Sequence, residues 1–191
     1  MATPNLHLTL FFSAGLSLDY WQRRGMFSRE VALYRRLTER GVHVRFITYG
    51  NASEYAYAAQ VPGITILPNR WNLRRRLYAA LLPLLYAPWL QRTDVIKTNQ
   101  MPGADGALRA ARRWRKPLVA RSGYLWSLHM GQDYGPAAER RARRIEQRVF
   151  GAADRIVLTT TQMADTVRER VPTPPTASPS FRIMLIPIRL H

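Results

Sequence analysis

Residues 27–50 of the chain read FSREVALYRRLTERGVHVRFITYG, and this stretch decides the fold class. Apolar side chains recur at close to helical spacing at Phe27, Val31, Tyr34 and Leu37. They predict a helix over residues 27–40 that ends before Gly41. Residues 42–49 then alternate between polar and apolar before turning apolar, which indicates a β-strand. An apolar, β-rich stretch at residues 6–13, LHLTLFFS, precedes the helix, so the order is that of a βαβ unit in a parallel sheet.

The same alternation continues toward the C-terminus. Further strands are expected at residues 64–67, 94–98, 117–121 and 155–160. Further helices are expected at residues 73–90, 104–114, 136–150 and 163–170. Six or seven strands thus alternate with helices, which predicts an α/β domain of Rossmann type: a doubly wound, mostly parallel sheet with helices on both faces. This domain is expected to span residues 1–171, followed by a Pro-rich linker and a strand-like tail over residues 172–191.

The composition is strongly basic. The 191 residues include 29 Lys and Arg against 12 Asp and Glu, a formal net charge of +17. Such a charge favours polyanions such as nucleic acid, anionic lipid headgroups or phosphorylated small molecules, although arginine-rich composition can equally reflect a genome's base content. The absence of cysteine excludes disulfides and thiolate metal sites. The N-terminal sequence MATPNLHLTLFF lacks the pattern of a secretory signal, so the cytoplasm is the expected compartment.

Several familiar cofactor motifs are missing. The loop after the first strand contains no G-x-G-x-x-G, which disfavours a nicotinamide or flavin enzyme, and no P-loop motif occurs. The four histidines are scattered without ligand spacing, so no metal site is predicted. Only His129 is considered for a site, because it is expected in a loop that follows a strand.

Ligands of an open parallel sheet bind beyond the carboxyl ends of its strands. Small, polar or glycine residues stand at the predicted strand ends, at residues 13–15, 48–50, 98–100, 121–124 and 159–160. They would let a ligand approach the backbone and would hydrogen-bond a hydroxyl-rich molecule. Polar residues also end strands in every fold of this kind, so each set taken alone is a weak signal.

The stretch GLSLDYWQRRGMFSREVALYRRLTERGVHVRFITYG at residues 15–50 resembles the opening of a group of family 4 glycosyltransferases. The residues that match this group in order are Trp21, Gly25, Arg29–Glu30, Leu33–Tyr34 and Thr48–Tyr49–Gly50. The resemblance continues through DVIKTNQMPGADGALRAARRWRKPLVARSGYLWSLHM at residues 94–130 and IEQRVFGAADRIVLTTTQM at residues 145–163. It covers residues 6–171.

The resemblance implies a GT-B fold, in which two Rossmann-like domains face each other across a cleft. The N-terminal domain mainly receives the acceptor, and the C-terminal domain binds the sugar nucleotide and carries a pair of glutamates. The last residues, LIPIRLH, match the family's Ile-Pro-Asn crossing only through Ile186–Pro187 and then depart from it. We therefore expect the chain to be truncated before the donor-binding domain and to be inactive alone. A sugar nucleotide would be the donor substrate of the complete enzyme, and no other cofactor is expected.

The resemblance also implies a glycan or lipid-linked acceptor, used in polysaccharide or glycolipid assembly. The residues expected to contact this acceptor are Gly15, Gly25, Tyr49, Asn99, Arg121, Tyr124 and His129. The two glycines would shape the first loop, Arg121 would supply charge, and the others would hydrogen-bond or stack. Many relatives carry a histidine where this chain has Arg121, which leaves the catalytic residues unassigned. A fold that has lost catalysis and acts as a binding module is the alternative.

The stretch LRRRLYAALLPLLYAPWL at residues 73–90 is unusually apolar behind three arginines. It is shorter than the ~20 apolar residues of a membrane-spanning helix, and its aromatic residues suit a helix lying on an anionic membrane surface. The alternative is a core helix with a solvated arginine end. The basic stretch ERRARRIEQRVF at residues 139–150 could track the phosphates of a nucleic acid, but it contains two glutamates and no interleaved aromatics. No nucleic-acid partner is therefore expected.

Overall fold

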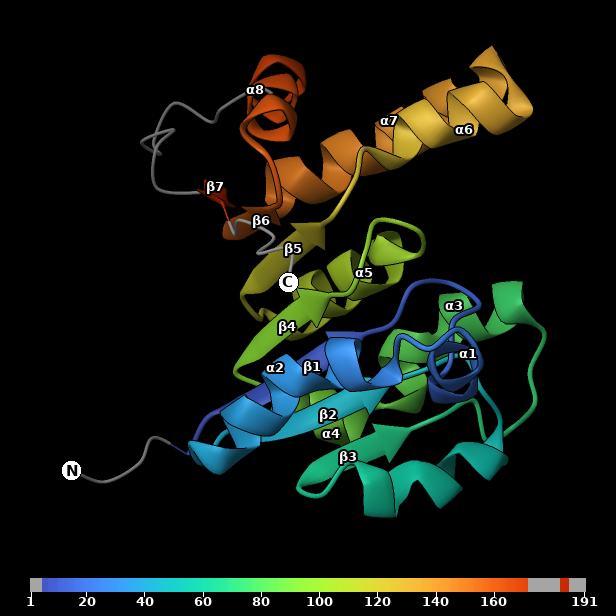
Figure 1. The fold of residues 1–191 in the computed structure, drawn as a ribbon, viewed down its shortest axis with the longest axis vertical. Coiled ribbons are helices and arrows are strands. Elements are labelled where there is room, and N and C mark those ends of the chain that lie inside the picture. The colour runs from blue at the N-terminus through green and yellow to red at the C-terminus, as the bar shows by residue number, and fades with distance from the viewer. Residues whose placement is uncertain (1–4, 172–182, 186–191) are drawn as a thin grey trace.

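The computed structural model describes residues 5–171 and 183–185, and these form one parallel sheet. Its strands are β1 (His7–Phe11), β2 (His43–Ile47), β3 (Ile64–Leu67), β4 (Val95–Thr98), β5 (Leu118–Ser122), β6 (Arg155–Leu158) and β7 (Ile183–Leu185). They lie in the order β3-β2-β1-β4-β5-β6-β7, and every neighbouring pair is parallel (Figure 1). The chain thus builds the sheet from β1 outward to β3, and then from β4 outward to β7. This confirms the predicted doubly wound sheet.

Helices cover both faces of the sheet, as right-handed crossovers in two opposite directions require. They are α1 (Leu18–Arg23), α2 (Phe27–Glu39), the 3₁₀ helix η1 (Ala52–Gln60), α3 (Arg75–Leu85), α4 (Ala87–Gln91), α5 (Ala104–Trp114), α6 (Trp126–Tyr134), α7 (Pro136–Ala152) and α8 (Thr161–Arg170). The first three pack on one face, over β1, β2 and β3, and α3, α4, α5, α7 and α8 pack on the other. The helix pair α6–α7 extends beyond the carboxyl ends of the strands (Figure 1).

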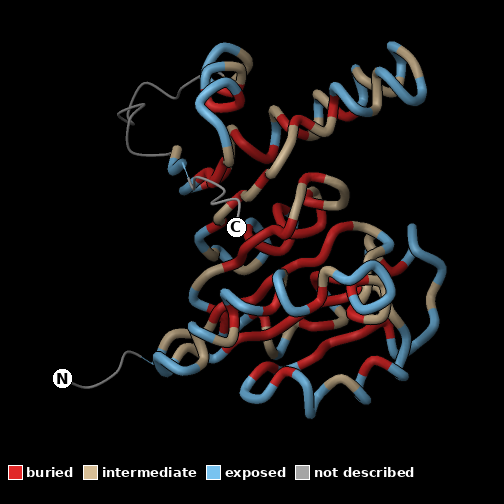
Figure 2. Tube along the Cα trace, viewed as in Figure 1, coloured by how far each residue is buried: buried red, intermediate tan, exposed pale blue. Residues whose placement is uncertain are grey.

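An apolar core lies on each face of the sheet, and the strands between the two cores are buried (Figure 2). On the α2 face, the rings of Phe12 and Trp21 stack with centroids 4.1 Å apart, and Phe46 lies 5.3 Å from Phe12. On the opposite face, Tyr78 and Leu82 of α3 are fully buried against the sheet. Because both faces of the sheet are covered, even polar strand side chains such as Thr9 and Arg45 are buried.

Three segments differ from the sequence predictions. The loop expected after β1 contains α1, whose N-terminus is capped by the Ser17 hydroxyl accepting from the amide of Tyr20 at 2.9 Å. The loop expected after β5 contains α6, which places His129 on a helix. The single helix expected at residues 73–90 is two helices, α3 and α4, because the helix breaks at Tyr86 and Pro88 begins a new one. Within residues 5–171 and 183–185, no helix has the length and apolar character that a membrane span needs.

The strand expected near the C-terminus is present as β7, paired in parallel with β6 at the edge of the sheet. The apolar run IMLI at residues 183–186 predicts a buried strand, but Met184 is 53% exposed and Leu185 is 42% exposed at this edge of the described sheet. The Pro-rich linker expected after residue 171 and the residues after Leu185 lie outside the part of the chain that the structure describes.

Candidate functional site

The loop after β1 packs closely against the start of α5 at the carboxyl edge of the sheet. The amide of Ala14 donates to the carbonyl of Pro102 at 2.9 Å. Gly103, with φ of 82°, stands so close that a Cβ built on it would lie 2.9 Å from Ala14. Only glycine meets both requirements, the positive φ and the close approach. This contact fixes the floor of the candidate site, and sequence reasoning did not single out Gly103.

Gly15 follows in the same loop with φ of 83°. A Cβ built on Gly15 would lie 3.5 Å from the guanidinium of Arg75, so this arginine at the start of α3 covers the glycine. In the sequence, Arg75 belongs to the arginine run before the apolar helix. The structure also places its guanidinium beside the predicted site residue Gly15.

Glu54 of η1 holds the first loop and the end of β2 together. Its buried carboxylate accepts from the backbone amides of Leu18 and Asp19, the latter at 3.3 Å, and from the hydroxyl of Thr48. Burial raises the pKa of Glu54, and these hydrogen bonds oppose that shift. The residue is therefore a structural anchor of the site wall. No sequence signal marked it, because a glutamate in a polar stretch reads as a solvated side chain.

Tyr49 stands directly after β2. Its amide donates to the carbonyl of Leu16 at 3.0 Å, and its ring packs edge-on against Tyr78, with centroids 5.2 Å apart. Burial raises the pKa of Tyr49 to about 12, and the neighbouring charges of Asp105 and Arg109 act in opposite directions. The phenol therefore stays protonated at neutral pH and is able to donate a hydrogen bond.

Asn99 and Arg121 are brought together at the ends of β4 and β5. The guanidinium of Arg121 donates to the backbone carbonyl of Asn99 at 3.1 Å, and the backbone amide of Arg121 donates to the Thr98 hydroxyl at 2.9 Å. Asn99 is buried, whereas Arg121 is half-buried. Because a guanidinium carries five N–H donors, Arg121 keeps donors available for a ligand after this contact.

A buried lysine, Lys97, lies two residues before Asn99 on β4 and on the same face as Arg121. Its ammonium donates to the hydroxyl of Tyr34 in α2 at 2.9 Å. Burial, reinforced by the positive charge of Arg121 and opposed by Glu30, lowers the pKa of Lys97 to about 7. Lys97 and Arg121 thus both lie on the face of the sheet that α2 covers, next to the candidate site. A lysine in the otherwise apolar strand VIKT was the available signal, and the sequence analysis did not use it.

Tyr124 and His129 are also neighbours, with ring centroids 4.8 Å apart and planes inclined by 33°. His129 is exposed on α6, not in a loop as expected. Gly25 stands apart from these pairs. It ends α1 with φ of 65°, and a Cβ built on it would meet no atom within 4 Å, so its role is that of a turn.

The site therefore consists of hydrogen-bond donors and positive charge around a glycine-containing loop. This arrangement suits a hydroxyl-rich or anionic ligand. Among residues 5–171 and 183–185, no three His, Asp or Glu side chains gather as a metal ion requires. The structure shows where the seven predicted residues lie, and their contact with a substrate stays a prediction.

Comparison with solved structures shows the same fold in several larger proteins. Sucrose-phosphate synthase from Thermosynechococcus elongatus matches with a TM-score of 0.59 at 14% identity, over 95% of this chain and 48% of that chain. Anabaena HepE, solved in complex with UDP-glucose, matches with a TM-score of 0.57 at 11% identity, over 95% of this chain and 43% of HepE. The lipopolysaccharide outer core galactosyltransferase WaaB matches with a TM-score of 0.50 at 11% identity, over 94% and 45%. The chain thus spans less than half the length of these relatives, and the likeness shows the fold alone.

The sequence itself supplies the family. No curated protein matches the chain. The profile of the family described as Glycosyltransferase Family 4 matches residues 25–179, which is most of the sequence. This agrees with the resemblance carried by Gly25 and the Thr48–Tyr49–Gly50 strand end, which lie within the match, and with the GT-B likeness of the sheet. The chain belongs to glycosyltransferase family 4.

Proposed function

We propose that this chain forms the acceptor-side wall of a glycosyltransferase that transfers a sugar from a sugar nucleotide to a glycan or lipid-linked acceptor. The observation that carries the proposal is the family match over residues 25–179, on a sheet whose carboxyl edge is lined with donors and positive charge. The alternatives from the sequence, a binding module without catalysis and a basic nucleic-acid-binding protein, are not favoured by this match.

In this proposal Arg121 and Asn99 orient the acceptor. Glycosyl transfer requires the acceptor hydroxyl to be held close to the anomeric carbon, and positioning of this kind lowers the barrier substantially. Arg121 is held by the Asn99 carbonyl at 3.1 Å, so its remaining donors project from a fixed point. Tyr49 adds a neutral phenol donor, and the Tyr124–His129 pair offers a surface for the flat face of a sugar. The resemblance to family 4 implies that the sugar nucleotide would be held by the second domain of the complete enzyme.

The acceptor proposal is tested by capture of saccharides. The immobilised chain is incubated with glycans and glycolipids extracted from membranes, and retained molecules are identified by mass spectrometry. Replacement of Arg121 by glutamine removes a charge-assisted contact and should weaken retention roughly tenfold. Arg36→Gln on α2 removes an exposed arginine far from the strand ends and should leave retention unchanged. Equal retention by both variants, or none of any saccharide, would overturn the proposal.

A transfer assay with radiolabelled sugar nucleotides and the same extract addresses the donor. We expect no transfer by this chain alone, because the family resemblance implies that the donor is held by a second domain. Transfer by the purified chain would show that the donor also binds within these residues.

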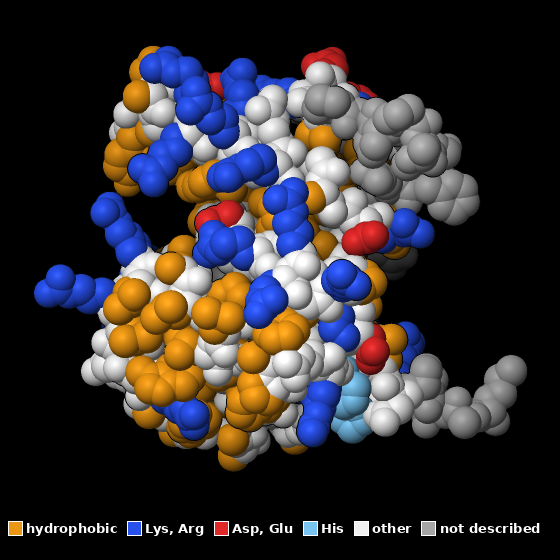
Figure 3. Space-filling view, turned by 180° about the vertical axis from the view of Figure 1, so that it is seen from behind, with side chains coloured by type: hydrophobic (Ala, Val, Ile, Leu, Met, Phe, Trp, Pro, Cys, Tyr) orange, Lys and Arg blue, Asp and Glu red, His pale blue; other side chains and the backbone are white. Residues whose placement is uncertain are grey.

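We further propose that this chain docks on an anionic membrane surface through residues 73–90. The inner face of α3 belongs to the core, but Leu77, Ala80 and Leu84 form an exposed apolar stripe on its outer side. The view from behind shows hydrophobic side chains gathered over the α3–α4 half of the molecule (Figure 3). Exposed arginines at residues 74–76 border this stripe. Since anionic lipids concentrate in the cytoplasmic leaflet, we place the chain at the inner face of the membrane.

Vesicle sedimentation tests the membrane proposal. Phosphatidylglycerol vesicles at low salt should pellet the wild-type chain, and phosphatidylcholine vesicles should not. Leu84→Glu puts a charge in the stripe and should abolish pelleting, whereas Leu33→Glu, at an exposed leucine of α2 on the opposite face, should not. If both variants pellet like the wild type, the stripe does not contact the membrane.

A further inference from the structure

A basic groove lies between α5, α7 and α8 and is not used by the acceptor site described above. Its volume is about 780 Å³, and its polar lining consists of Asp105, Arg141, Arg144, Gln147, Arg148 and Arg170. From behind, lysine and arginine side chains are seen to crowd the half of the molecule that holds α7 (Figure 3). Four arginines and one aspartate face a space of the size that small ligands occupy, about 300–1,000 Å³.

The arginines of this basic groove come from a single helix face and one fixed neighbour. Arg141, Arg144 and Arg148 are spaced by three and four residues along α7, so they lie in one row on its surface, and all are exposed. Arg170 is the last residue of α8 and lines the groove opposite this row.

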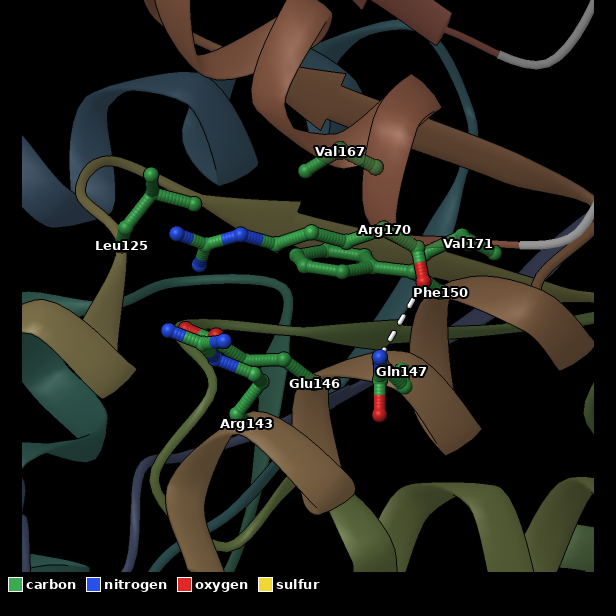
Figure 4. Close-up of a pocket in the computed structure, with 8 residues that line it drawn as sticks. All are labelled: Leu125, Arg143, Glu146, Gln147, Phe150, Val167, Arg170 and Val171. Carbon is green, nitrogen blue, oxygen red and sulfur yellow. Dashed lines mark hydrogen bonds between the residues drawn. The ribbon is translucent and has the colours of Figure 1, made fainter. Parts of the chain in front are cut away.

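Arg170 is held in place by α7 and by the start of α6. Gln147 donates from its side-chain amide to the backbone carbonyl of Arg170 at 3.1 Å, and the Arg170 guanidinium donates to the Ser127 hydroxyl at 3.4 Å. Figure 4 shows the Arg170 side chain extended along the ring of Phe150, with Gln147 reaching its carbonyl from below. The Arg170 side chain is therefore ordered, with its guanidinium turned toward the buried Ser127 hydroxyl, and the three arginines of α7 supply the exposed charge of the groove.

Within the part of the chain that the structure describes, this positive charge is not neutralised. Asp105 is paired with Arg109 at 2.7 Å, outside the row. Glu139 of α7 pairs with Arg143. Among residues 5–171 and 183–185, no ion pair joins Arg141, Arg144, Arg148 or Arg170 to a carboxylate. Like charges at such spacing repel each other, and a multivalent anion would relieve that repulsion.

We propose that this basic groove binds a diphosphate group. Planar guanidinium groups donate in pairs to phosphate oxygens, and two phosphates joined in one molecule would reach more than one arginine of the row. Asp105 lies in the first turn of α5, two residues after Gly103, whose backbone packs against Ala14, so the groove opens next to the candidate acceptor site. We assign the diphosphate to the acceptor, as the group that links its saccharide to a carrier; this assignment rests on the proposed function, whereas the anion site does not.

Calorimetry with inorganic pyrophosphate tests the site directly. The wild-type chain should bind pyrophosphate more tightly than inorganic phosphate, and the affinity should fall with added salt. The double substitution Arg144→Gln/Arg148→Gln should weaken pyrophosphate binding by about tenfold or more. The control Arg36→Gln/Arg40→Gln removes the same charge from α2 and should have little effect. All four positions are exposed, and circular dichroism confirms that each variant folds.

Three results would overturn the site. The first is that the wild-type chain does not bind pyrophosphate. The second is that both double variants weaken pyrophosphate binding equally. The third is that a single-stranded oligonucleotide binds more tightly than pyrophosphate, and that the groove variant no longer binds it. The first indicates that the groove holds no diphosphate site, the second that only net charge acts, and the third that the groove is a nucleic-acid surface. Saccharide capture separates this site from the proposed function. If a groove variant loses pyrophosphate binding but still captures the acceptor as well as the wild type does, only the assignment of the diphosphate to the acceptor is refuted. The anion site and the proposed function then both stand.

Discussion

Replacing Lys97 by methionine should stabilise the chain at pH 6 and change its response to pH. Lys97 is only 9% exposed, and its ammonium donates to the Tyr34 hydroxyl at 2.9 Å. No carboxylate among the described residues forms an ion pair with it. Burial and the nearby Arg121 lower the pKa of Lys97 from 10.5 to about 7. Methionine has a similar length and no charge, so it removes this unfavourable burial.

The direction and size of the effect follow from proton linkage. Below pH 7 the lysine is charged in both states, and the folded state bears the cost of burying the charge. Between pH 7 and 10.5 the unfolded chain holds one proton more than the folded chain, so the free energy of unfolding rises with pH. The slope is about 1.4 kcal/mol per pH unit. From pH 6 to pH 9, Lys97 therefore adds about 3 kcal/mol to the wild-type stability.

Urea denaturation at pH 6 and pH 9 measures this contribution. The wild-type chain should gain about 3 kcal/mol more than the Lys97→Met variant over this range, because the variant lacks the titrating group. Loss of the Tyr34 hydrogen bond shifts the stability of the variant at both pH values and cancels in the comparison. Lys116→Met, which removes the only other lysine, serves as the control and should follow the wild-type pH dependence. Parallel pH profiles for the wild type and Lys97→Met would refute the reasoning.

Two further predictions concern the loop and the helix that flank the site. Gly103→Ala should destabilise the fold by about 2–4 kcal/mol, because the new Cβ would lie 2.9 Å from Ala14 and the residue would also carry the strain of positive φ. Gly25→Ala should cost only about 1–2 kcal/mol, because only the positive φ is unfavourable there. Equal losses of stability in thermal unfolding would contradict this. Leu82→Ala should lower the free energy of unfolding by about 2–5 kcal/mol, because Leu82 is fully buried. Leu84→Ala, at a side chain 56% exposed on the same helix, should change it by less than about 0.5 kcal/mol. Similar urea midpoints for the two variants would show that α3 faces the core differently.

Much of the architecture was predictable because local patterns carry it. The βαβ signal in residues 27–50 and the later strand–helix alternation led to the doubly wound sheet that the structure has. The family was recognisable from Trp21, Gly25 and the strand end at Thr48–Tyr49–Gly50. The errors lie where local pattern is weak: α1 and α6 are short helices in stretches that contain glycine, serine and aromatic residues, and they were read as loops.

The site was predictable only in part. The rule that ligands bind beyond the carboxyl ends of strands led to Asn99 and Arg121, which the structure brings into contact, and to Tyr124 and His129, whose rings are neighbours. It did not lead to Lys97, since a residue inside a strand is not at a strand end, nor to the covering of Gly15 by a side chain of α3.

The sequence by itself determined the order of strands and helices, the family and the excess positive charge, because periodicity, ordered motifs and composition are properties of the chain read in one dimension. Only the tertiary structure decided which charges meet. Residues far apart in sequence, such as Glu54 with Leu18 or Tyr34 with Lys97, come together when crossovers return each strand to the same edge of the sheet. That packing buries Lys97 and so lowers its pKa, and it leaves the arginine row on α7 exposed. Neither outcome is a property of one residue alone.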